Sequence, residues 1–146
     1  MTALSLLLAA TLVLVSALHA YWGIGGVWPG MDRKSCARAV VGFAGAPMPG
    51  VAACFAVAGM LALFALLAPA VAGVFATPFR QSSLAGAGLF VGLVFLFRGA
   101  LGFTPFWRRM TPEMPFAQLD RRYYSPLCLA LGAGFLVLAL EGLAAA

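Results

Sequence analysis

The length of its uncharged apolar stretches constrains this chain more than any other feature. The first stretch runs from Thr2 to about Tyr21 without one charged side chain, which is the length of a single membrane crossing. Of the 146 residues, 64% are hydrophobic and 9% are charged. A soluble domain carries roughly a quarter charged residues, and a compact soluble fold of this composition would have an apolar exterior. We therefore predict an integral membrane protein.

Four such stretches predict four spanning helices, each bounded by residues that start or stop helices. The second contains Pro69 near its far end. The third opens at Ser82 and Ser83, interpreted as an N-cap, and the fourth opens at Ser125 followed by Pro126, interpreted as a cap and a first helical proline. We expect the first stretch to be a retained span and not a cleaved signal peptide, because no basic residue precedes it. The spans are expected at about residues 2–21, 50–74, 83–101 and 126–143.

These spans predict an all-α membrane protein, a four-helix transmembrane bundle of two helical hairpins, with residues 1–146 forming one domain. The basic residues are sorted between its two sides. Of the nine, Arg80 alone falls in the short middle connection, and the rest lie in or beside the two long connections: Arg33, Lys34, Arg38, Arg98, Arg108, Arg109, Arg121 and Arg122. By the positive-inside rule the long connections are cytoplasmic. We predict a bacterial inner-membrane protein with both termini extracytoplasmic.

All Trp and Tyr residues fall on this same side. We interpret four of them as interfacial anchors: Tyr21, Trp22, Trp28 and Trp107. The favoured interpretation places the long connections in the headgroup layer, where their arginines pair with anionic lipid. The alternative is a cytoplasmic-facing pocket that these connections cover.

Two ionisable residues near span ends are candidates for a polar site. His19, the sole histidine, ends a stripe of Ser5, Leu12 and Ser16 that should face the bundle interior. Its ordinary role would be a hydrogen bond to a carbonyl at the end of the helix. Arg98 borders a face on which glycines could pack closely, formed by Gly88, Gly92 and Gly99. We hypothesise a shared pocket for an anionic group, with its polarity set by Asp120, Tyr124 and Ser125.

Other chemistry has little support in the sequence. Three cysteines without a CxxC pair and one histidine are a poor metal set, so we expect no metal and no cofactor. Nucleic acid is not an expected partner, because the basic residues adjoin membrane spans. Arg80 and Glu141, at the outer side, could pair with one another. Enzymatic activity is undecided, but no recognised catalytic set is present.

Three segments together resemble a known family. They are His19-Ala20-Tyr21-Trp22-Gly23-Ile24-Gly25-Gly26-Val27-Trp28, Arg98-Gly99-Ala100-Leu101-Gly102-Phe103, and Asp120 followed by Tyr124-Ser125-Pro126-Leu127-Cys128-Leu129. In order and over essentially the whole chain, they are similar to the small bacterial integral membrane proteins of domain of unknown function 3995. The resemblance implies a four-helix inner-membrane protein and no assigned activity. Relatives often carry an acid where this chain has Phe103, so an ion pair of Arg98 with that position is not expected.

Two functions remain open. The favoured one is a non-enzymatic module that binds a protein or lipid partner through the basic, aromatic cytoplasmic cap. We expect anionic lipid headgroups among its partners. A homo-oligomer that packs through the glycine face is a further expectation. The alternative is a small-molecule transporter or membrane enzyme with its site at the cytoplasmic end of the bundle. The lack of ionisable groups at mid-membrane favours the first.

Overall fold

The computed structural model of the chain describes residues 1–145. Over these residues all of its regular secondary structure is helical, and there is no strand. Its elements are α1 (Thr2–Gly23), α2 (Arg33–Val40), α3 (Val51–Val71), α4 (Gln81–Leu101), α5 (Pro105–Met110), α6 (Phe116–Leu119), the π-helical segment η1 (Asp120–Tyr124) and α7 (Ser125–Ala144). Within the described residues, four helices are long and apolar enough to cross a membrane, which confirms the fold class. The protein is a multi-pass membrane protein.

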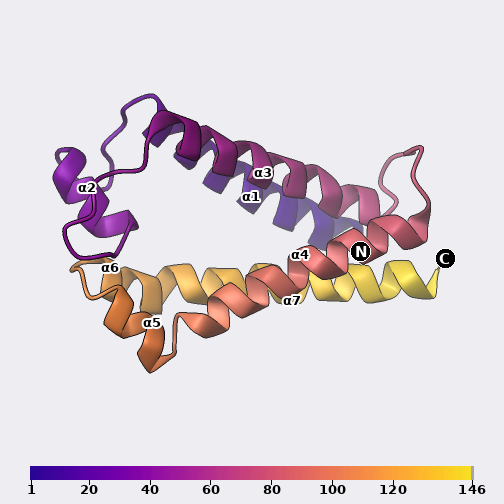
Figure 1. The fold of residues 1–146 in the computed structure, drawn as a ribbon. Coiled ribbons are helices and arrows are strands. Elements are labelled where there is room, and N and C mark those ends of the chain that lie inside the picture. Colours follow the sequence, from indigo (N-terminus) through magenta and orange to yellow (C-terminus); the bar gives the residue numbers. More distant parts are fainter. Residues whose placement is uncertain (146) are drawn as a thin grey trace.

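The four long helices form the two expected hairpins (Figure 1). α1 packs along α3 and α4 packs along α7, with far fewer contacts between the two pairs. Both termini lie at one end of the bundle, where the pairs come together, and the pairs diverge toward the opposite end. α2, α5 and α6 lie at that opposite end. We call residues 24–50 and 102–124, which contain these short helices, the cap.

The α1–α3 hairpin is held by small and polar residues on its inner faces. Ser5 and Leu12 are fully buried, as the stripe on α1 predicts. Ser16 Oγ donates a hydrogen bond of 2.7 Å to the carbonyl of Ala58 on α3. Small side chains on α3 allow this close approach, and a hydrogen bond between helices adds to packing where hydrocarbon supplies no competing water.

The α4–α7 hairpin uses the glycine face that the sequence suggested for contact with a second copy. A Cβ added to Gly132 of α7 would lie 2.8 Å from the Gly92 carbonyl oxygen of α4, so the two backbones touch. Gly88, Gly92 and Gly99 are all buried within the chain. α7 therefore covers this face within one chain, and the expected homo-oligomer stays a prediction.

The ends of the second and third spans differ from their predicted positions. α3 ends at Val71 and not at 74, because the chain turns at Gly73 with φ of 67°, a conformation that favours glycine. α4 begins at Gln81, with Arg80 as an N-cap that makes no side-chain bond, so Ser82 and Ser83 lie inside the helix. The Gln81 side chain instead donates a 2.7 Å hydrogen bond to the Val71 carbonyl and satisfies the end of α3.

The fourth span begins earlier than expected. α6, η1 and α7 follow one another without a break from Phe116, and Ser125 has helical φ and ψ, so Ser125 is not an N-cap. Pro126 lacks a backbone N–H and would crowd the carbonyl four residues before it in a regular helix. The wider π turn before Pro126 accommodates both the missing N–H and the bulk of the proline ring. The helix therefore continues through Pro126, and this proline does not mark a helix start.

The expected Arg80–Glu141 pair is not found. Within residues 1–145 the ion pairs are Arg38–Glu113 and Arg98–Asp120, and both belong to the other end of the bundle.

Candidate functional site

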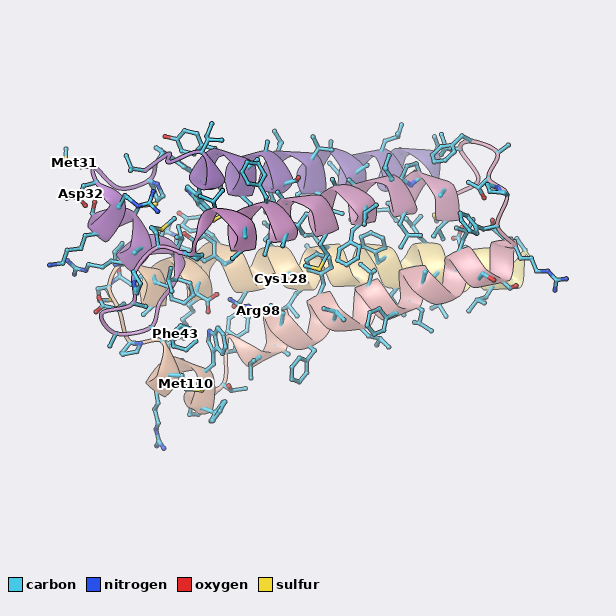
Figure 2. All side chains as sticks on the ribbon, turned by 45° about the horizontal axis from the view of Figure 1, so that its top comes forward. Met31, Asp32, Phe43, Arg98, Met110 and Cys128 are labelled. Atoms are coloured by element: carbon cyan, nitrogen blue, oxygen red, sulfur yellow. The ribbon has the colours of Figure 1, made fainter. Side chains whose placement is uncertain are left out.

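A cavity of about 430 Å³ lies between the diverging hairpins, directly below the cap. Its floor contains Leu12, Leu61 and Leu131, which also belong to the buried core, and its upper wall contains Val40, Phe116 and Tyr124 of the cap. His19 and Arg98 both line it. Arg98 and Cys128, labelled in Figure 2, lie in the half of the bundle nearest α2 and α5. The volume falls within the roughly 300–1,000 Å³ of small-molecule sites.

Arg98 is held by three partners from three elements. Its Nη2 donates to Asp120 Oδ1 at 2.7 Å, and its Nη1 donates to Ser125 Oγ at 3.4 Å. The guanidinium carbon lies 4.7 Å from the centre of the Trp107 ring, and Trp107 Nε1 donates to Asp120 Oδ2 at 3.1 Å. Because the Asp120 side chain is only 3% exposed, its charge depends on these donors.

The π turn explains how Asp120 and Ser125 reach the same guanidinium. The backbone N–H of Ser125 bonds to the carbonyl of Asp120, so one π turn separates the two residues and brings both side chains to one face. Gly102, at the end of α4, packs directly against the Ser125 side chain. A side chain at position 102 would separate the end of α4 from this turn, which is why a glycine suits the position.

His19 forms the opposite polar wall, on α1. Its Nδ1 lies 2.8 Å from the carbonyl oxygen of Val15, one turn earlier and inside α1, and not from a free carbonyl at the end of the helix as the sequence suggested. A carbonyl oxygen only accepts, so Nδ1 carries the proton in the neutral ring and Nε2 is left as an acceptor. The imidazole also packs edge-on against Trp22, with ring centres 4.9 Å apart. His19 and Trp22 separate the main cavity from a smaller one of about 300 Å³ that reaches Met48 and Pro49.

Contacts between the two long connections keep the cap closed over the cavity. Tyr124 donates its hydroxyl to the Ala39 carbonyl at 3.1 Å. Glu113 accepts from Arg38 Nε at 3.2 Å and from the Gly45 backbone at 3.3 Å, and its own N–H donates to Gly42 at 3.2 Å. The sequence did not indicate this role of Glu113, because its partners lie more than 65 residues away along the chain.

Helix α2 of the cap has its own capping and charge pattern. Asp32 accepts the backbone N–H of Ser35 at 2.7 Å, and Ser35 bonds back to Asp32, which completes a capping box. These hydrogen bonds, led by the backbone one, lower the pKa of Asp32. One turn on, Cys36 is buried, and desolvation raises the pKa of its thiol. The thiol therefore stays protonated at neutral pH and serves as a packing residue.

The structure places the five candidate site residues around one end of the bundle. His19, Arg98 and Tyr124 line the cavity, while Asp120 and Ser125 lie behind Arg98. Two residues interpreted as interfacial anchors also belong to this arrangement: Trp22 lines the cavity and Trp107 stacks on Arg98. Tyr21 and Trp28 are 40% and 62% exposed and remain at the surface. Among residues 1–145, no three His, Cys, Asp or Glu side chains gather as metal ligands would.

The comparison with protein families decides the chain's relationship. The family model described as Protein of unknown function (DUF3995) matches residues 12–135. The chain belongs to this family. The DUF3995 match begins at Leu12 in the cavity floor and extends past Leu131, so it includes every cavity residue named above. No curated protein and no solved structure matches this DUF3995 member.

Proposed function

We propose that the protein is a non-enzymatic membrane module that binds a lipid-like molecule in the cavity between its hairpins. The observation that carries the proposal is the cavity itself, whose apolar wall of α1, α3, α4 and α7 is interrupted only by a few polar groups below a closed cap. Such a wall suits a hydrocarbon body with one polar end. The Arg98, Asp120 and Ser125 side chains are occupied with one another, which favours binding over bond-making chemistry.

The floor of the cavity supports a binding role over a transport role. Leu12, Leu61 and Leu131 are 0%, 6% and 4% exposed and pack into the core that fills the half of the bundle nearest the termini. A separate cavity at the far end, beside Glu141, contacts Val71 and Leu138 of the same core. A transported molecule would have to pass through this packed layer.

Blocking the cavity tests the proposal. Val15 lines the cavity, so a Val15→Trp substitution should fill it and remove most of the bound lipid. Val13, two residues away and 54% exposed, faces outward, so Val13→Trp is the matched control and should retain the lipid. Native mass spectrometry of protein extracted in mild detergent measures the retained molecules. Equal lipid retention in the wild type and in both variants would contradict a ligand in the cavity.

We further propose that the cap faces the cytoplasm of a bacterial cell, from the inner membrane, and touches anionic headgroups. The support is the charge of the cap, which carries six exposed basic side chains besides Arg38: Arg33, Lys34, Arg108, Arg109, Arg121 and Arg122. Each basic residue near an anionic surface contributes about 1 kcal/mol of attraction. The termini, at the other end of the bundle, would then be extracytoplasmic.

Reporter fusions test this orientation. Alkaline phosphatase fused after residue 145 should be active, because the enzyme folds only outside the cytoplasm, and green fluorescent protein at the same place should stay dark. The same reporters inserted after Gly45, in the cap, should give the reverse pattern. A fluorescent C-terminal fusion would show that the positive-inside rule had been applied to the wrong side.

A further inference from the structure

We infer that the ligand is a neutral single-chain lipid whose head offers a hydroxyl group to His19 and a carbonyl oxygen to Arg98. This inference rests on the proposed function and names the class of molecule that the same cavity selects. It also revises the hypothesis of an anionic ligand, because the structure shows which hydrogen-bond donors and acceptors of the cavity residues are not used within the protein.

His19 has an acceptor to offer. Its Nδ1–H is used by the Val15 carbonyl, and the hydrogen bonds of residues 1–145 include none to Nε2. No buried side-chain nitrogen or oxygen in the described residues lacks a partner, so Nε2 keeps accessible surface and is not enclosed by protein. His19 lines the main cavity and the smaller one beside it. A ligand that supplies an O–H at this point gains a hydrogen bond that an ester or ether oxygen cannot make.

Arg98 has donors to offer but no uncompensated charge. Asp120, almost fully buried, lies 2.7 Å from its Nη2 and neutralises it. A ligand carboxylate or phosphate at Arg98 would bring a second negative charge to a guanidinium whose charge Asp120 already balances. A guanidinium has five N–H donors, and the hydrogen bonds of Arg98 to Asp120 and Ser125 use two of them. The remaining donors suit a neutral carbonyl oxygen.

The rest of the cavity suits a hydrocarbon chain. Leu12, Val15, Leu61 and Leu131 supply apolar surface below the two polar groups, and the volume of about 430 Å³ is at the lower end of the usual range, which favours one chain over two. A head with a hydroxyl and an ester, attached to one acyl chain, supplies one group suited to the His19 acceptor and one suited to the Arg98 donors. A monoacylglycerol has this chemistry.

Four probes with one and the same oleoyl chain test the inference on the full-length protein in detergent: monoolein, methyl oleate, oleate and oleoyl lysophosphatidic acid. Monoolein should bind about tenfold more tightly than each of the others, because it alone combines a hydroxyl group with a neutral head, and tenfold is the worth of about one buried hydrogen bond. His19→Phe should weaken monoolein binding about tenfold and leave methyl oleate binding unchanged. His19→Gln, which keeps an acceptor, should retain the preference for monoolein.

The outcomes separate this inference from the proposed function. Tighter binding of oleate or lysophosphatidic acid than of monoolein, abolished by Val15→Trp, would overturn the neutral head and leave the cavity as a lipid site. An equal loss of monoolein and methyl oleate in His19→Phe would overturn the role of the Nε2 acceptor. Absence of saturable binding for all four probes, or binding that Val15→Trp does not change, would overturn the proposed function itself.

Discussion

Arg98→Met is expected to destabilise the protein by about 3–5 kcal/mol, because it leaves the Asp120 carboxylate buried without its cation. Trp107 would still donate to Asp120 Oδ2, but one neutral donor does not replace a guanidinium at 2.7 Å. For a chain of this size, roughly 2–4 °C of melting temperature corresponds to each kcal/mol, so the expected loss is about 10 °C. Thermal unfolding in detergent, followed by tryptophan fluorescence, measures it.

The two halves of the ion pair should not be equivalent. The Arg98 side chain is 30% exposed and lies in the last turn of α4, so in Asp120→Asn the arginine can reach the interface and the loss should be smaller. The double variant Arg98→Met with Asp120→Asn should recover part of the loss, since neither charge remains. Arg80→Met, at an exposed arginine outside the ion pairs of residues 1–145, is the control and should change stability by no more than about 0.5 kcal/mol. Equal losses in both single variants, without recovery in the double variant, would contradict the pairing.

The positions of the spans could be predicted because each charged residue is excluded from the hydrocarbon layer whatever its neighbours are, so uncharged stretches can be found from composition alone. The ends of the helices could not, because a helix end depends on its contacts. Ser82 and Ser83 look like caps, yet the bond that joins the second and third spans comes from the Gln81 side chain to the Val71 carbonyl. Pro126 looks like a first helical residue, yet the π turn before it continues the helix from Phe116.

The candidate site was predicted in part for the same reason. His19 and Arg98 stand out in the sequence because ionisable groups are rare in spans. Trp22 and Trp107 do not stand out as site residues, because tryptophan is common at a membrane interface. Only the structure shows that Trp107 stacks on Arg98. Asp120 and Ser125 are five residues apart, a spacing that a regular helix would not place on one face and a π turn does.

The glycine contact between α4 and α7 predicts the second large effect, a loss of about 1–3 kcal/mol in Gly132→Ala. The new Cβ would lie 2.7 Å from the Leu96 backbone nitrogen and 2.8 Å from the Gly92 carbonyl oxygen. Backbone atoms in the middle of a helix cannot rotate away as a side chain can, so the two helices must separate. Melting temperature in detergent measures the loss, and size-exclusion chromatography should show an unchanged oligomeric state.

Three alanine substitutions should fall in an order that the distances set. A Cβ at Gly92 meets its nearest atom at 3.1 Å, so Gly92→Ala should cost less than Gly132→Ala. Gly86 lies on α4 with no atom within 4 Å of the added Cβ, so Gly86→Ala should be neutral or stabilise by up to about 1 kcal/mol through helix propensity. If all three substitutions stabilised the protein equally, helix propensity alone would account for them. The glycine face would then be free to pack against a second copy, contrary to its burial under α7.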